Sequence, residues 1–352
     1  MFYALDCQIT IGDKQFDAVH EVEITTSGKI LEDTATIKLP SICKIHQNGQ
    51  FTYAQPTASA FAIGEEVVIK LGYNGVLRKE FHGFVKRILP DTTVSIVCED
   101  ATFLLRRKRL HQSWQSVTVE QVIQFALDGT GVTIDCKVPT IKFTHFYLRD
   151  TTPAQVLQEL IEKYGLTIYF NGFKKLYVGL GFDLKDIKIV RYDTGVNVIS
   201  DNLEVIDSED TQIRVKAIGF KPDGTKVEAE IGDGADEDKG IILRKKPQKT
   251  IQTVFKPDKS DGAEVRTLHF YNVHDREALK EMARAELRKR KFTGFKGGLT
   301  TFLIPFAKVG DTARLIDSIY QRGDGDYIIE KVVTTFGTSG ARRKVEIGLK
   351  IK

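Results

Sequence analysis

Apolar residues alternate with polar ones through most of the first hundred residues, and this pattern limits the possible folds more than any other feature of the sequence. The alternation covers residues 3–11, 22–24, 35–39, 67–71 and 94–98. A period of two is typical of strands that bury one face. About six such strands must close on themselves or stack, so we expect a tube-like β-barrel over residues 1–105, with residues 41–62 as a projecting loop.

A helical period replaces the alternation from about residue 106. Thr118 and Gln121 have the spacing of a capping box, and Thr152-Pro153 open a second apolar stripe that ends at Gly165. Strand patterns follow on both sides of Asn171-Gly172, a preferred two-residue hairpin turn. Residues 106–189 are therefore predicted to form a small α+β domain.

Strand patterns return after residue 189. Residues 213–217 and 227–231 form a predicted hairpin, and Asp275 caps a predicted helix at about 275–292. Residues 233–259 are charged and irregular. We expect a second tube-like β-barrel domain over residues 190–352, which makes the whole chain an α+β protein that is mainly β.

A short internal sequence repeat, which we call the echo, links the two strand-rich regions. Gly64 and Gly310 each follow an apolar residue and precede an acidic residue and a strand, and Phe81 and Tyr327 each lie 17 residues further on. Such an echo is expected if one β module was duplicated. Gly64 and Gly310 are therefore predicted to be equivalent barrel turns, with Phe81, Gly83 and Tyr327 packing the strands that follow. These residues are architectural rather than catalytic.

Several segments, taken in order, resemble one known family. They are Gly64-Glu65, Glu80–Ile88 (EFHGFVKRI), Thr151–Leu166, Val309–Asp311 and Asp326–Val332. Each segment is degenerate, but their order along nearly the whole chain resembles the late control D family of phage tails. That family is similar to the amino-terminal part of type VI VgrG spikes, which together form the baseplate hub of contractile injection machines.

The resemblance implies a homotrimer in which each subunit contributes two barrels. Six similar units would then match the sixfold symmetry of a tail tube on one side of the ring. The outer domains would keep threefold symmetry and match a spike on the other side. DNA or another cargo would pass through the lumen. The hub would be assembled in the bacterial host cytoplasm and end in the virion baseplate, with a prophage as the expected source. Because the chain ends at Lys352 directly after a strand, we expect the spike or lysozyme-like protein to be a separate partner.

Composition and motifs argue against other classes. Hydrophobic residues make up 41% and charged residues 28%, which is ordinary globular usage, and no 18-residue apolar run predicts a membrane span. The amino terminus lacks the pattern of a secretory signal, so we expect folding in a cytoplasm. The four cysteines show no metal or disulfide spacing and are predicted to be buried thiols. The net charge of +4 does not predict a polyanionic partner.

An enzyme and a nucleic-acid-binding protein remain as alternatives. The sequence has no His-Glu-x-x-His, Gly-x-Ser-x-Gly or Walker motif, and we expect no metal and no cofactor. The acidic run at 233–238 lacks the final Glu of a calcium-binding loop and is predicted to be solvated. A cell-wall-degrading glycosidase that uses paired Asp and Glu residues stays open, as does DNA binding through the basic runs at 106–109, 243–246 and 288–291.

Overall fold

The structure of the chain is a computed structural model. It describes residues 4–44, 46–47, 50–51, 54–184, 188–206, 212–221, 225–232, 242–243, 264–270, 273–317 and 324–351. The predicted charged stretch at 233–259 lies outside these residues except for 242–243. None of the described helices combines the length and the apolar character that a bilayer crossing needs.

The first region is built from antiparallel strands. They are β1 (Leu5–Ile11), β2 (Lys14–Phe16), β3 (Glu21–Ser27), β4 (Thr34–Pro40), β9 (Glu66–Tyr73), β10 (Val76–Leu89) and β11 (Thr93–Glu99). Between residues 41 and 62 lie β5 (Ile42–Cys43), β6 (His46–Gln47), β7 (Gln50–Phe51), β8 (Gln55–Pro56) and a 3₁₀ turn (Thr57–Ser59). The alternating positions form the core, since Ile9, Ile37, Ile69 and Ile96 are fully buried. All four cysteines are free thiols, but only Cys7 and Cys98 are buried as predicted, whereas Cys43 and Cys136 are partly exposed.

The α+β region follows without a break. Its elements are α1 (Thr102–Leu105), β12 (Leu110–Thr118), α2 (Val119–Leu127), β13 (Thr133–Ile134), β14 (Lys142–Thr151), α3 (Pro153–Tyr164), β15 (Thr167–Gly172) and β16 (Lys175–Gly179). Both predicted helices carry capping boxes, and Gly165 ends α3 with a φ of 68°. The antiparallel ribbon of β12 and β14 was not predicted from the sequence.

The predicted hairpin exists, but its predicted turn is wrong. Strands β15 and β16 pair through Gly172 and Lys175, so Phe173-Lys174 form the turn instead of Asn171-Gly172. The ladder also has a register irregularity between Phe170 and Gly172. The Phe173 ring stacks on the His82 ring at 3.4 Å between centroids, which anchors the hairpin tip to β10.

The last region contains two separate sheets. One contains β22 (Ile242–Leu243), β21 (Lys226–Gly232), β20 (Ile213–Phe220) and β23 (Glu264–Phe270), and it packs on α4 (Arg276–Arg290). The predicted hairpin and helix are both present. The apolar residues of this unit share one core with the α+β region. A separate core lies under β17 (Ile189–Asp193), β24 (Gly294–Thr301), β25 (Thr312–Ile316), β26 (Gly325–Gly337) and β27 (Gly340–Lys350). Two short strands, β18 (Ser200–Asp201) and β19 (Glu204–Ile206), pair with β24.

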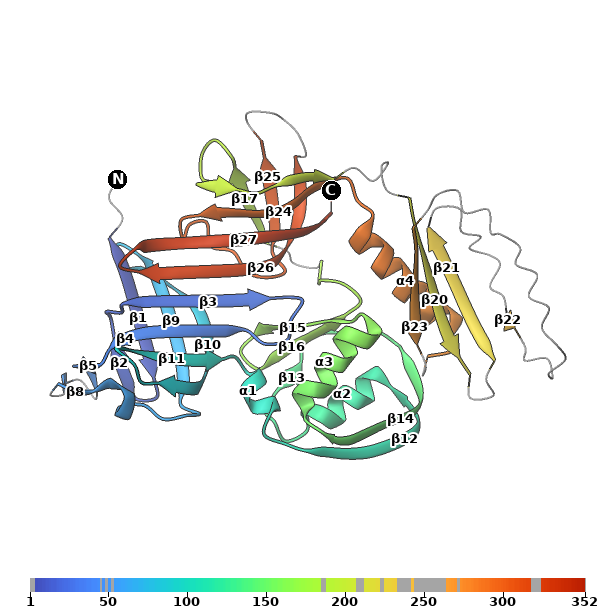
Figure 1. Cartoon of the computed structure of the whole chain (residues 1–352), viewed down its shortest axis with the longest axis horizontal. Helices are drawn as coiled ribbons and strands as arrows, with labels where there is room; N and C mark the ends of the chain where they lie inside the picture. The colour runs from blue at the N-terminus through green and yellow to red at the C-terminus, as the bar shows by residue number, and fades with distance from the viewer. Residues whose placement is uncertain are drawn as a thin grey trace.

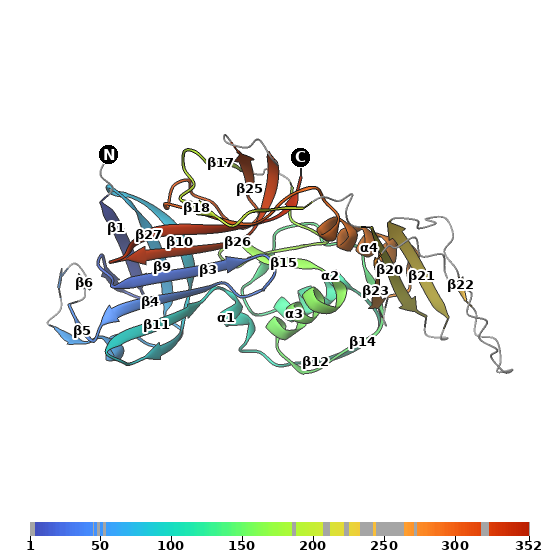
Figure 2. The same ribbon diagram turned by 45° about the horizontal axis from the view of Figure 1, so that its top comes forward.

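One large sheet joins the first and last regions (Figure 1). Strand β26 pairs antiparallel with β3 over Lys331–Gly337 and Glu21–Ser27, so the two regions share a continuous ladder. The unit of β20, β21, β23 and α4 lies at the opposite end of the molecule from β1 and β4 (Figure 2). In the part of the chain that the structure describes, no sheet closes into a barrel. The fold is therefore α+β and mainly β, and barrel closure stays a prediction.

Candidate functional site

The two predicted glycine turns have the same backbone geometry. Gly64 has a φ of +89° and Gly310 a φ of +88°, in the region that favours glycine. The Gly64 N–H donates to the Val85 carbonyl at 2.8 Å, and the Val85 N–H donates back to the Glu65 carbonyl at 2.9 Å. In the last region, Gly310 donates to Ile329 and Ile329 donates to Asp311, both at 2.9 Å.

The acidic residue after each glycine closes its own turn. Glu65 Oε2 accepts from the Ala62 N–H, and Asp311 Oδ2 accepts from the Lys308 N–H, both at 2.9 Å. The strand that faces each turn then bulges at the next position. The ladder shifts between Val85 and Arg87 in β10, and between Ile329 and Lys331 in β26. The two turns thus agree in φ, in hydrogen bonding and in the place of the bulge.

The two aromatic residues of the echo, Phe81 and Tyr327, do not occupy equivalent positions in the two ladders. Tyr327 lies opposite Ala313, whereas Gly83, not Phe81, lies opposite Val67 at the corresponding place in the first region. Phe81 packs two positions earlier in β10 and is 4% exposed. The 17-residue spacing therefore matches residues at different ladder positions.

Gly83 and Tyr327 fill that shared ladder position in different ways. A Cβ atom on Gly83 would lie 2.2 Å from the Glu99 carbonyl oxygen, so only glycine fits there. Tyr327 is fully buried, and its hydroxyl accepts a hydrogen bond from the Phe295 N–H at 3.0 Å. The hydroxyl supplies the partner that a buried N–H needs.

A cavity of about 410 Å³ lies where the three regions meet. Phe81 and Gly310 line it, whereas Gly64, Gly83 and Tyr327 are absent from its lining. The predicted residues are thus only partly brought together. The lining also includes residues that sequence reasoning missed, among them Glu80, Asp100, Phe173, Lys188, Phe306 and Arg343.

A buried ion pair between Glu80 and Arg343 joins the first region to the last. The Arg343 guanidinium binds both carboxylate oxygens of Glu80, at 2.7 and 3.1 Å, and the two side chains are 6% and 1% exposed for Glu80 and Arg343. Arg343 also donates to the Leu303 and Ala307 carbonyls at 3.3 and 3.2 Å. A buried charge needs this degree of pairing. Its signal was in the sequence, because Arg343 occupies an inward position between Ala341 and Val345 in the alternation of β27.

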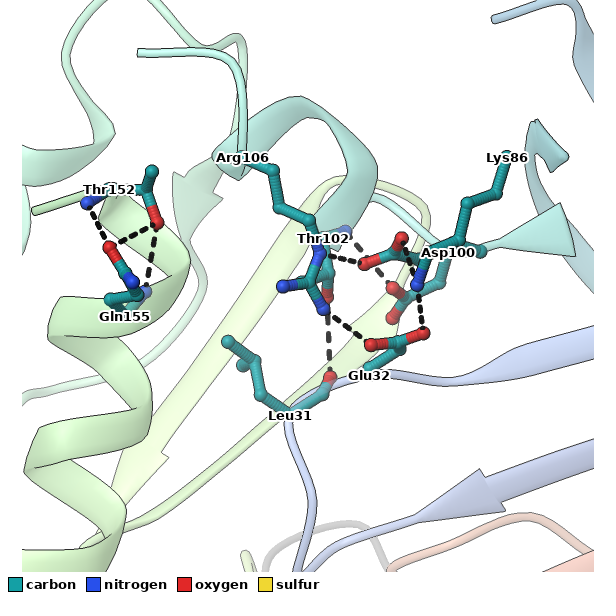
Figure 3. Close-up of polar contacts among 9 residues, drawn as sticks. Leu31, Glu32, Lys86, Asp100, Thr102, Arg106, Thr152 and Gln155 are labelled. Atoms are coloured by element: carbon teal, nitrogen blue, oxygen red, sulfur yellow. Dashed lines mark hydrogen bonds and ion pairs between the residues drawn. The ribbon is translucent and has the colours of Figure 1, made fainter. Parts of the chain in front are cut away.

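A second polar cluster connects β11 to α1 (Figure 3). Glu99 is fully buried and binds Arg106 Nε at 2.6 Å and Lys86 Nζ at 3.0 Å. Both cations also bind Glu32. Asp100 Oδ1 accepts from the Thr102 N–H at 3.0 Å, whereas its buried Oδ2 has no hydrogen-bond partner among the described residues. Burial raises the pKa of Asp100 to about 7.

The basic runs singled out in the sequence are partly neutralised within the chain. Arg106 binds Glu99 and Glu32, and Arg290 binds Glu286 at 2.6 Å. Lys289 donates to the Gly165 carbonyl at 3.4 Å, which fixes α4 to the end of α3. The run at 243–246 lies outside the described residues after Leu243, as does the acidic run at 233–238. Within the described part of the chain, no group of three or more His, Cys, Asp and Glu residues is placed to hold a metal ion.

Comparison with solved structures relates this geometry to known proteins. A 43 kDa tail protein of prophage MuSo2 from Shewanella oneidensis aligns over 97% of this chain and 97% of its own, at 14% identity and a TM-score of 0.62. A tail protein from Neisseria meningitidis aligns over 98% and 97%, at 13% identity and a TM-score of 0.64. This chain has the tail-protein fold. The resemblance predicted from the sequence is thereby confirmed at the level of the fold.

A type VI secretion protein shares the same fold. This E. coli component, described as structurally similar to two T4 bacteriophage tail proteins, aligns over 98% of this chain and 77% of its own. The identity is 9% and the TM-score is 0.57. No family model matches the chain, and no curated protein matches it by sequence. The tail-protein fold is therefore visible in the backbone arrangement rather than in sequence identity.

Proposed function

We propose that this chain is a structural hub protein in the baseplate of a phage tail or a related contractile injection machine, and that it is not an enzyme. The tail-protein fold, which covers nearly the whole of this chain and of two solved tail proteins, supports a baseplate-type structural role. Neither a glycosidase nor a DNA-binding role is favoured by a specific observation in the described residues.

The pair of glycine turns carries the proposal. Two distant segments agree in φ, in reciprocal hydrogen bonds and in bulge position. In our proposal these segments are the same part of two duplicated β modules, each of which completes a tube-like barrel in the assembly. Gly64 and Gly310 are then equivalent barrel turns, and Phe81, Gly83 and Tyr327 pack the strands that follow them.

Duplication gives a trimer the means to match a sixfold partner. Three chains with two modules each present six similar units in a closed ring, built from contacts between unlike faces. The proposed partners are a tail tube protein on the sixfold side and a separate spike or lysozyme-like protein on the threefold side. DNA or another cargo would pass through the lumen. The hub would be assembled in the host cytoplasm and reside in the virion baseplate.

The test is the mass and shape of the particle. We expect native mass spectrometry to give three times 39.6 kDa, and electron microscopy to show a ring with a central hole and six similar inner lobes. Because a ring can also close only on its partner, the same measurements are made after co-expression with the neighbouring tail proteins. A monomer in both preparations, or a ring with three dissimilar pairs of lobes, contradicts the proposal.

A further inference from the structure

Three exposed cations surround one aromatic ring, Phe306, that lines the cavity between the three regions. Arg78 Cζ, Lys188 Nζ and Lys308 Nζ lie 5.5, 5.0 and 5.8 Å from the centre of the Phe306 ring. We call these four residues the Phe306 cluster. They come from β10, from the segment before β17 and from the loop before β25, so the folded chain brings them together from distant parts of the sequence.

The buried cation beneath the ring is already neutralised. Arg343 Cζ lies 5.1 Å from the Phe306 ring centre, and its charge is paired with Glu80. Among the described residues, by contrast, Arg78, Lys188 and Lys308 form no salt bridge. Lys188 Nζ donates to the Phe306 carbonyl at 2.6 Å, which fixes its position without balancing its charge. The exposed side of the cluster therefore carries an excess of positive charge.

The electrostatics of Lys188 agree with this excess. Burial lowers the pKa of Lys188, and the charges of Arg78, Arg343 and Lys308 lower it further, against the opposing effect of Asp311. The Asp311 carboxylate is engaged in its own turn, where it accepts from the Lys308 N–H at 2.9 Å. Like charges held this closely repel one another, and a bound anion would relieve the repulsion.

We propose that the Phe306 cluster binds an acidic segment of a partner protein. This inference rests on the proposed function, in which other baseplate proteins must be held on the hub. Exposed apolar surface on the same connection as Phe306, between β24 and β25, favours a peptide over a nucleic acid, since Phe302 is 42% exposed and Ile304 is 58% exposed. A segment with two or three carboxylates and one large apolar side chain satisfies both features.

The compactness of the cluster also disfavours nucleic acid. Binding to a nucleic-acid backbone needs basic residues that follow several phosphates, and single strands need open aromatic faces for stacking. Here the three cations converge on one ring and cover it. A short run of carboxylates fits such a convergent site, because lysine and arginine bind carboxylates in charge-assisted hydrogen bonds.

The probe is a fluorescein-labelled octapeptide of sequence Glu-Asp-Leu-Glu-Asp-Phe-Glu-Asp, titrated with the full chain and followed by anisotropy. We expect saturable binding that weakens as salt rises, because the contacts are ionic. The same peptide with Gln and Asn in place of Glu and Asp should bind at least tenfold more weakly. The triple variant Arg78→Gln, Lys188→Gln, Lys308→Gln should also lose at least tenfold in affinity.

A matched control separates site binding from general charge attraction. Lys142, Arg288 and Lys296 are exposed cations elsewhere on the molecule, and changing all three to Gln removes the same net charge. This control should bind the peptide as the unmodified chain does. Phe306→Leu keeps an apolar side chain and tests the ring if the triple variant fails to fold. Equal losses in both triple variants, or no peptide binding by the unmodified chain, would overturn the proposal.

A labelled 20-base-pair DNA duplex is the competing probe. Tighter binding of the duplex that depends on the same three cations would replace the peptide site with a nucleic-acid site. The particle mass is measured on the same samples. A trimer that does not bind the acidic peptide contradicts this inference alone, whereas peptide binding by a chain that stays monomeric even after co-expression with the neighbouring tail proteins contradicts the hub proposal alone.

Discussion

The Gly64 and Gly310 turns have nearly identical backbones but different surroundings. A Cβ atom added to Gly64 would lie 3.7 Å from the Phe103 ring. A Cβ atom added to Gly310 would lie 3.2 Å from the Tyr169 hydroxyl oxygen. The residue opposite the third position after the glycine is Gly83 in the first region and Tyr327 in the last. A turn fixed by φ and main-chain hydrogen bonds therefore tolerates very different side chains around it.

The two regions also depend on each other. Their sheets are continuous through β3 and β26, and the Glu80–Arg343 pair connects β10 to β27 beneath the cavity. Neither region therefore forms a sheet or a polar network independent of the other. The following variants test how far the two regions are equivalent and how far they are coupled.

The largest effect is expected from breaking the buried ion pair. Arg343→Ala leaves Glu80 buried without a partner and should lower the free energy of unfolding by about 3–5 kcal/mol. The double change Arg343→Met with Glu80→Leu removes both charges and should recover most of that loss. Urea unfolding midpoints give the measurement. Lys344→Ala, at the next and exposed position of β27, is the control and should change stability by no more than about 0.5 kcal/mol. Equal effects of Arg343→Ala and Lys344→Ala would contradict this role for the pair.

A pH effect is expected where β11 of the first region leads into α1. The pKa of Asp100 is raised from 3.8 to about 7 by burial, so the folded state holds a proton that the unfolded state releases. The contribution of this carboxyl to stability therefore falls as pH rises from about 4 to 7, and the penalty is complete above pH 7. Asp100→Asn removes this carboxyl, whereas the neighbouring Asp33 carboxyl, whose pKa is also raised by burial and by the charge of Asp100, remains.

The measurement is the slope of melting temperature against pH, taken for the unmodified chain and for the Asp100→Asn variant. The stability of the Asn variant relative to the unmodified chain should rise by about 2–4 kcal/mol between pH 4 and pH 8. Asp128→Asn, on a side chain that is 84% exposed, serves as the control with no such change. Parallel pH curves for Asp100→Asn and the unmodified chain would show that the buried carboxyl does not titrate in this range.

The glycine turns themselves should respond alike, with a small and defined difference. Gly64→Ala and Gly310→Ala each force a side chain into a positive φ and should cost about 1–2 kcal/mol. Gly310→Ala should cost a few tenths of a kcal/mol more, because the Tyr169 hydroxyl must move. Gly181→Ala is the control, since its added Cβ meets nothing within 4 Å and its φ is not positive. A large stability loss in one turn variant alone would argue that the turns are not equivalent.

Local sequence patterns predicted the helices and strands well, but they predicted the contacts between distant parts of the chain poorly. The capping box of Thr118 and the helix start at Thr152-Pro153 were readable because every group involved lies within a few residues. The pairing of β3 with β26 was not, because about 300 residues separate the partners and no local pattern specifies them. The echo identified both glycine turns but misplaced the aromatic match. Val85 lies 21 residues after Gly64, whereas Ile329 lies 19 after Gly310, and spacing alone does not reveal the longer hairpin.

The smallest effects should come from the acidic residues that close the two turns, and here the regions should differ in a predictable order. Asp311→Ala leaves the Lys308 N–H without its acceptor and removes a carboxylate that favours the charged form of Lys188, and it should cost about 1 kcal/mol. Glu65→Ala loses the equivalent bond to the Ala62 N–H and also the contact with Lys14 Nζ at 3.1 Å, so it should cost a few tenths of a kcal/mol more.

Raising the salt concentration separates the two contributions of Glu65. Screening weakens the ion pair with Lys14 much more than the short bond inside the turn, so the difference between the two variants should shrink in 1 M NaCl. The variants Glu65→Gln and Asp311→Asn keep a carbonyl acceptor and should recover part of the loss at both sites. If Asp311→Ala lowers stability more than Glu65→Ala at low salt, the two side-chain acceptors do not have equivalent roles in their turns. The likeness of the two turns then rests on the main chain alone.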